Sequence, residues 1–242
     1  MSSASPEVTV ERPIRTASIT AGIGLLFMAA LAGFGKFVAV DGLVTPGDAA
    51  QTARDITESA GLFRLGIASL FLVIALDVVV AWGLYRVFSP VSRNLSLIAA
   101  AFRLVYSGVF LVAIGQLFGP LRLFADDAYL GVFSVDQLNS QALLEIAAFS
   151  DLWMMSLGLF GIHLLALGYL AYRSGYVPRV LGVLLVIAGL GYVIDSFGVM
   201  LYPGGWTDVS TYTFLGEFLL ALWLVIWGRR VTSIGSPELN RE

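Results

Sequence analysis

The feature that most constrains this chain is a series of long apolar stretches. A helix needs about 20 predominantly apolar residues to span the hydrocarbon core of a bilayer. Six stretches of the 242-residue chain meet this requirement: Ala17–Val40, Leu62–Leu84, Leu95–Phe118, Leu152–Tyr172, Val180–Tyr202 and Tyr212–Gly228. The sequence therefore predicts an all-α polytopic membrane protein, built as a bundle of six transmembrane helices.

Composition points to the same class. Hydrophobic residues make up 58% of the chain and charged residues 13%, whereas a soluble domain carries about 25% charged residues. Because so few charged residues cannot cover a water-facing surface, we expect the lipid bilayer to cover most of the protein surface. The net charge of −3 argues against nucleic acid as a partner. With no cysteine and one histidine, no cofactor or metal is expected, and only a hard cation held by carboxylates stays open.

The distribution of arginine predicts which side of the membrane each connection occupies, because cytoplasmic loops are enriched in basic residues. Connections on one side carry nine arginines, at positions 12, 15, 86, 93, 173, 179, 229, 230 and 241, and those on the other side carry Arg54 and Arg122. We therefore expect cytoplasmic tails at residues 1–15 and 231–242. Between them, residues 16–230 form a multi-pass domain in the cell membrane.

Two outer connections have helical patterns of their own. The segment VTPGDAAQTARDITESAG predicts a short surface helix, with Thr45 as its cap, Pro46 in its first turn and Gly61 at its exit. Val135–Phe149 alternates apolar and polar residues at helical spacing. This second segment predicts an interfacial helix before the fourth span.

Three titratable or charged side chains lie deep in the predicted spans: Asp77, Arg103 and His163. Each is nine or ten residues from an arginine at the cytoplasmic end of its span, which is about 13–15 Å along a helix. Asp77 and Arg103 lie on neighbouring spans joined by a tight turn, so we expect them to pair. His163 has two interpretations, a proton relay beside that pair or a neutral imidazole bonded to a backbone or tyrosine group. All three are candidates for ligand binding or proton relay.

A second set of charged residues lies toward the outer side: Lys36, Arg64, Asp151, Asp195 and Glu217. Asp195 continues a stripe of small residues on the fifth span, Ala188, Gly191 and Gly198. Small residues let a neighbouring helix approach closely, so this face is expected to point inward, toward Lys36 or Arg64. The outer polar cluster has two interpretations, a structural ion pair between helices or a wet vestibule that binds a ligand.

Three segments together resemble a known family: PGDAAQTARDI, SPVSRNLSLIAAAFRLVYSGVF and FGIHLLALGYLAYRSGYVPRVLGVLLVIAGLGYVIDSF. The resemblance is to the prokaryotic membrane family of domain of unknown function 4386. It extends from the first span to about Pro203, and its strongest part is the connection GYLAYRSGYVPRVLGVLL. The resemblance implies a multi-pass membrane protein of similar length and no particular activity.

Three functions stay open. In the preferred one, the protein is non-enzymatic and binds a small or lipid-like ligand, hydrophobic or ionic, or a partner helix in the membrane. In the second, it is a proton-coupled transporter with Asp77, Arg103 and His163 as a relay near mid-membrane. In the third, it is an intramembrane enzyme for a lipid substrate, with Asp151, Asp195 and Glu217 as acid–base groups and a divalent cation as a possible helper.

Overall fold

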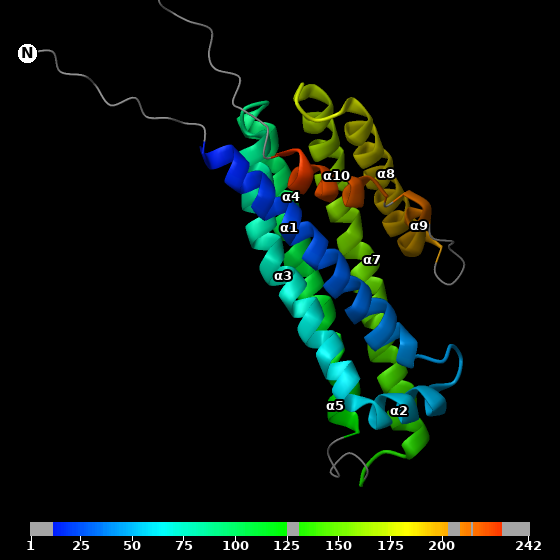
Figure 1. The fold of residues 1–242 in the computed structure, drawn as a ribbon. Coiled ribbons are helices and arrows are strands. Elements are labelled where there is room, and N and C mark those ends of the chain that lie inside the picture. Colours follow the sequence, from blue (N-terminus) through cyan, green and yellow to red (C-terminus); the bar gives the residue numbers. More distant parts are fainter. Residues whose placement is uncertain (1–11, 125–130, 203–208, 214, 229–242) are drawn as a thin grey trace, which may run out of the picture.

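The computed structural model describes residues 12–124, 131–202, 209–213 and 215–228, which fold as helices joined by short turns (Figure 1). The all-α prediction is confirmed. Five helical segments are long and apolar enough to cross a membrane, and they correspond to the first five predicted spans: Ile14–Leu43, Ala60–Phe88, Arg93–Leu123, Val135–Arg173 and Arg179–Leu201. The first is built from α1 (Arg12–Gly33), a π-helical segment η1 (Phe34–Val40) and a 3-10 turn η2 (Asp41–Leu43).

The other four long segments run alternately along the bundle. They are α3 (Ala60–Phe88), α4 (Arg93–Gln116) with its continuation α5 (Phe118–Leu123), α7 (Val135–Arg173) and α8 (Arg179–Leu201). Ser92 caps the start of α4 by accepting the Leu95 N–H at 3.4 Å, which ends the tight turn between α3 and α4. Because this turn is short, α3 and α4 pack as antiparallel neighbours, as predicted.

The six-span count is not confirmed. The predicted sixth span, Tyr212–Gly228, overlaps the end of α9 (Ser210–Thr213) and contains most of its residues in α10 (Leu215–Ile226). Among the described residues, α10 is apolar but shorter than the five long segments. Figure 1 shows it lying obliquely across the bundle between α8 and α1. Gly216 packs against the backbone of Leu184, and Ser18 of α1 donates a hydrogen bond to the Leu224 carbonyl at 3.1 Å.

The expectations for the two outer connections need correction. The first forms α2 (Ala49–Glu58), but its cap is Asp48, which accepts the Gln51 N–H at 2.8 Å, rather than Thr45. Gly61 does not end this helix, because α3 already begins at Ala60. Residues 135–149 are no separate interfacial helix: they continue without a break into α7, which has 39 residues. Figure 1 places α2 and α5 at the end of the bundle opposite the start of α1.

Glycines set the close packing of α7 against α8. A Cβ atom on Gly168 would lie 2.7 Å from the Gly182 carbonyl oxygen, and one on Gly182 would lie 2.8 Å from the Gly168 carbonyl oxygen. Real Cβ atoms do not approach backbone this closely, so both positions need glycine. The small-residue stripe on α8 is buried, as predicted, and its Gly191 packs against Thr213 of α9.

Candidate functional site

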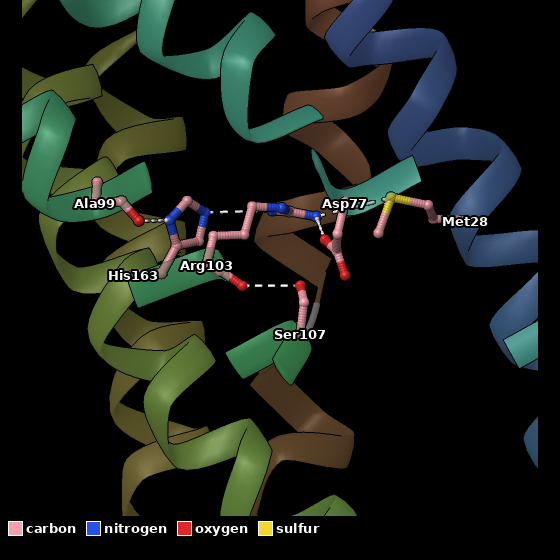
Figure 2. Close-up of polar contacts among 6 residues, drawn as sticks. All are labelled: Met28, Asp77, Ala99, Arg103, Ser107 and His163. Carbon is pink, nitrogen blue, oxygen red and sulfur yellow. Dashed lines mark hydrogen bonds and ion pairs between the residues drawn. The ribbon is translucent and has the colours of Figure 1, made fainter. Parts of the chain in front are cut away.

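The centre of the bundle holds a buried ion pair between two helices. Arg103 of α4 contacts Asp77 of α3, with 2.7 Å between Nη2 and Oδ1, and the side chains are 2% and 0% exposed (Figure 2). The predicted pairing is therefore confirmed. It was predictable because α3 ends and α4 begins at the same turn, so both helices extend from it into the bundle, and similar residue counts from that turn reach the same depth.

His163 of α7 lies on the other side of Arg103, and its hydrogen bonds define its protonation state. Its Nδ1 is 2.8 Å from the carbonyl oxygen of Ala99, which can only accept, so Nδ1 carries a proton. Its Nε2 is 3.3 Å from Arg103 Nη1, which can only donate, so Nε2 presents a lone pair. The ring is therefore the neutral Nδ1–H tautomer, and it holds Arg103 in place by accepting from it. We call Asp77, Arg103 and His163 the polar centre.

Apolar and weakly polar groups enclose the polar centre. Met28 of α1 lies with its Sδ 3.8 Å from Arg103 Nη2, and the guanidinium carbon lies 5.2 Å from the centroid of the Phe160 ring. Ser107 donates to the Arg103 carbonyl at 2.9 Å (Figure 2). These neighbours were not predicted. Phe160 and Ser107 could have been found, because they lie three and four residues from His163 and Arg103 on the same helix faces. Met28 carries no such signal.

Several polar atoms of this region are buried without a well-formed hydrogen bond. Within the described ranges they are both carboxylate oxygens of Asp77, Nε of Arg103, Oγ of Ser96 and Oε1 of Glu217. The short contact between Arg103 and Asp77 is an ion pair whose angle does not meet that of a hydrogen bond. A buried polar atom without a partner costs about 1–3 kcal/mol. The region is therefore under-satisfied for a folded interior.

Glu217 of α10 borders the polar centre rather than the outer surface. It interacts with the Tyr192 side chain of α8 and lies within electrostatic range of Arg103 and Asp77. Part of the residue reaches the bundle surface, whereas its Oε1 is fully enclosed. The predicted outer position of Glu217 is therefore wrong, because α10 is oblique and its first turn packs beside Leu184 on α8.

The remaining members of the predicted outer cluster are not brought together. Lys36 pairs with Asp41, with 2.5 Å and 2.6 Å from Nζ to the two carboxylate oxygens. These residues are five apart, which matches the hydrogen-bond repeat of the π-helix that contains Lys36 and ends just before Asp41. Arg64 and Asp151 are exposed.

Asp195 caps a helix instead of pairing with Lys36 or Arg64, so that expectation is wrong. Its carboxylate accepts the backbone N–H groups of Val209 at 2.8 Å and Ser210 at 2.6 Å, at the start of α9. A buried carboxylate is well suited to this position because the first N–H groups of a helix have no partner within the helix. Asp195 therefore has a structural role inside α8, because its hydrogen bonds connect α8 to the start of α9.

A narrow crevice between α3, α4 and α7 leads to His163. Its lining includes Tyr85 and Phe88 of α3, Ser96 and Ala99 of α4, and Leu167 of α7. In this conformation it is too narrow to admit a water molecule. Ser96 and His163 are the polar members of an otherwise mostly apolar wall, and the hydroxyl of Ser96 is one of the unpartnered atoms.

The family model described as Domain of unknown function (DUF4386) matches residues 20–228. An uncharacterised protein of Archaeoglobus fulgidus is 36% identical over 170 residues, covering 70% of this chain and 88% of that protein. No solved structure matches the chain. The family match includes every residue of the polar centre and extends through α10. The chain therefore belongs to the DUF4386 family, whose molecular activity is unknown.

Proposed function

We propose that this protein is an integral protein of the cell membrane that binds a small or lipid-like ligand at the polar centre without catalysing a reaction. The observation that carries the proposal is the buried hydroxyl of Ser96 together with Nε of Arg103, which have no hydrogen-bond partner among the described residues, beside the Asp77–Arg103 ion pair. In a native interior such atoms are normally satisfied by protein, water or a ligand. A ligand with hydrogen-bonding groups would complete the shell around Arg103 and Asp77.

The crevice beside His163 supports a lipid-like ligand. Binding sites for such molecules are mostly apolar, with a few polar groups that fix orientation. Here Phe88 and Leu167 supply apolar wall, while Ser96 and His163 supply the polar groups. Because the crevice is closed in this conformation, the helices must separate slightly for a ligand to enter.

The intramembrane-enzyme alternative has less support. It needs Asp151, Asp195 and Glu217 to act on one substrate, yet Asp195 already binds two backbone N–H groups and Asp151 is exposed. One observation supports the proton-coupled carrier: the buried carboxylates of Asp77 and Glu217 outnumber the cations beside them.

We also propose the finer topology. The five long helices cross the membrane, α9 and α10 return the chain toward the side where it began, and both termini lie in the cytoplasm. The contact between Ser18 and Leu224 supports this, because it joins the start of the first span to the end of α10. The arginines at positions 86, 93, 173 and 179 lie at the ends of α3, α4, α7 and α8 that border the two turns at that same end of the bundle. On this proposal α2 and α5 lie on the outer surface.

Native mass spectrometry of protein purified in mild detergent, with extraction of bound small molecules and lipids, tests the binding function. We expect the wild type to carry a stoichiometric bound species. Ser96→Ala should lower its occupancy without unfolding the protein, since the lost hydroxyl has no hydrogen-bond partner among the described residues. Ser140→Ala, on the exposed face of α7, is the matched control. A wild-type protein that carries nothing, together with equal behaviour of both variants, would contradict the proposal.

A further inference from the structure

The charges around the polar centre do not balance. Two carboxylates, Asp77 and Glu217, lie near a single permanent cation, Arg103. His163 adds no charge, because its hydrogen bonds require the neutral ring. If both carboxylates were ionised, the centre would carry one uncompensated negative charge in an apolar environment. An unpaired charge in such a place costs several kcal/mol.

Arg103 is already committed to other partners. Its two terminal nitrogens contact Asp77, His163 and Met28, and the guanidinium lies over the Phe160 ring. Arg103 therefore acts on Glu217 only across a distance, and in the described part of the chain it is the one cation that does so.

Apart from Arg103, whose nitrogens already contact other partners, the groups that face Glu217 cannot neutralise its charge. From α8 the facing group is Tyr192, from α4 it is Tyr106 together with Arg103, and from α3 it is Asp77. Each tyrosine offers a neutral hydroxyl, and Asp77 adds a second negative charge. One oxygen of Glu217, Oε1, is fully enclosed and has no hydrogen-bond partner within the described ranges. The carboxyl group is thus held inside the bundle, and its Oε1 can still accept a proton or contact a cation.

We propose that Glu217, together with Tyr192 and the Asp77–Arg103 pair, forms a site for one monovalent positive charge. The charge is either a proton carried on the Glu217 carboxyl or a small cation, such as an alkali ion or a primary ammonium group, seated against it. This inference rests on the proposed function, and it specifies that the bound ligand carries one positive charge. A proton at this position is also what a proton-coupled carrier would require.

Two measurements on the full-length protein in lipid nanodiscs test the inference and separate the two sources. Infrared spectroscopy at neutral pH reports whether Glu217 carries a proton, through a carbonyl band that Glu217→Gln removes and Glu217→Asp shifts. Thermal unfolding is then followed with added sodium, potassium or methylammonium chloride, and with N-methylglucamine chloride as a control for ionic strength. A bound cation at about one hundred times its Kd should raise the Tm by roughly 5–10 °C.

Either source supports the site. A protonated band with no cation-specific Tm shift identifies the proton. A Tm shift with one cation, lost in Glu217→Gln and kept in the exposed control Glu58→Gln, identifies that cation. An ionised Glu217 with no response to any cation would overturn the inference. If Glu217→Gln fails to fold, the wild-type spectrum with Glu217→Asp and the wild-type cation series still decide. Because neither readout needs a co-purified molecule, failure of the proposed ligand binding would be seen separately.

Discussion

Gly161 of α7 and Gly189 of α8 pack backbone to backbone in the middle of the helix pair. A Cβ atom on Gly161 would lie 2.6 Å from the Gly189 carbonyl oxygen, and one on Gly189 would lie 2.7 Å from the Gly161 carbonyl oxygen. Together with Gly168 and Gly182 they repeat every seven residues on each helix, so the two helices touch over two full turns. The same helix pair carries His163 of the polar centre and Tyr192, which interacts with Glu217.

Gly161→Ala is therefore expected to destabilise the protein, by about 1–3 kcal/mol. The added Cβ meets a backbone carbonyl that cannot rotate away, so the helices must separate. Thermal unfolding in detergent measures the effect. Gly108→Ala is the control, because nothing lies within 4 Å of its Cβ position, and there alanine should be neutral or slightly stabilising. Equal Tm values for the two variants would argue against this close packing.

Removing one member of the buried ion pair should lower the free energy of unfolding by more than removing both members. Asp77→Leu leaves Arg103 buried without its counter-ion, which typically costs about 3–5 kcal/mol. The double variant Asp77→Leu with Arg103→Met replaces the pair by apolar side chains and should recover much of that loss. A double-mutant cycle by thermal or denaturant unfolding measures the coupling. Additive effects of the two substitutions would mean that the pair contributes no coupling.

Loss of the Asp195 cap should loosen α9. Asp195→Ala removes the acceptor for the N–H groups of Val209 and Ser210, at an expected cost of about 1–2 kcal/mol. Asp195→Asn keeps one acceptor oxygen and should lie between the wild type and the alanine variant. Amide hydrogen exchange at Ser210 reports the change locally. Asp151→Ala, at an exposed position, is the control, and faster exchange in that variant as well would count against a specific cap.

Labelling with a membrane-impermeant thiol reagent should report the topology, because the chain has no cysteine of its own. In intact cells Arg64→Cys and Asp151→Cys are expected to react from outside, and Arg173→Cys only after permeabilisation. His163→Cys should react slowly from both sides, since residue 163 is 1% exposed. Labelling of positions 64 and 173 from the same side would refute the proposed orientation.

The parts of the site that could be predicted are those that depend on helix geometry alone. Asp77 and Arg103 were matched in depth by counting residues from one turn, and the fixed rise of a helix makes such a count reliable. The side-chain partners of His163 could not be assigned by counting, because they depend on how α7 rotates against α4. The sequence left two interpretations of His163 open, a proton relay and a neutral imidazole bonded to a backbone or tyrosine group. The contact of its Nδ1 with the Ala99 carbonyl favours the neutral imidazole.

The errors over Glu217 and Asp195 have one physical origin, the path of the chain after α8. Hydropathy measures how apolar a segment is and does not show that α10 lies obliquely across the bundle (Figure 1). Counting inward from an assumed outer surface therefore misplaced Glu217. Asp195 was expected to seek a basic side chain, whereas its partners are backbone N–H groups fourteen and fifteen residues later. Reasoning from charged pairs cannot find such partners, because every residue type except proline carries them.

The unbroken course of α7 has a mechanical consequence. At 39 residues it is about 58 Å long, nearly twice the thickness of the hydrocarbon layer, so a large part must stand clear of the lipid or the whole rod must lean. His163 sits on the same rod as the segment that meets α2 and α5 at the far end. Because α7 has no break between these two points, the segment that contacts α2 and α5 and the imidazole beside Arg103 belong to one rigid helix.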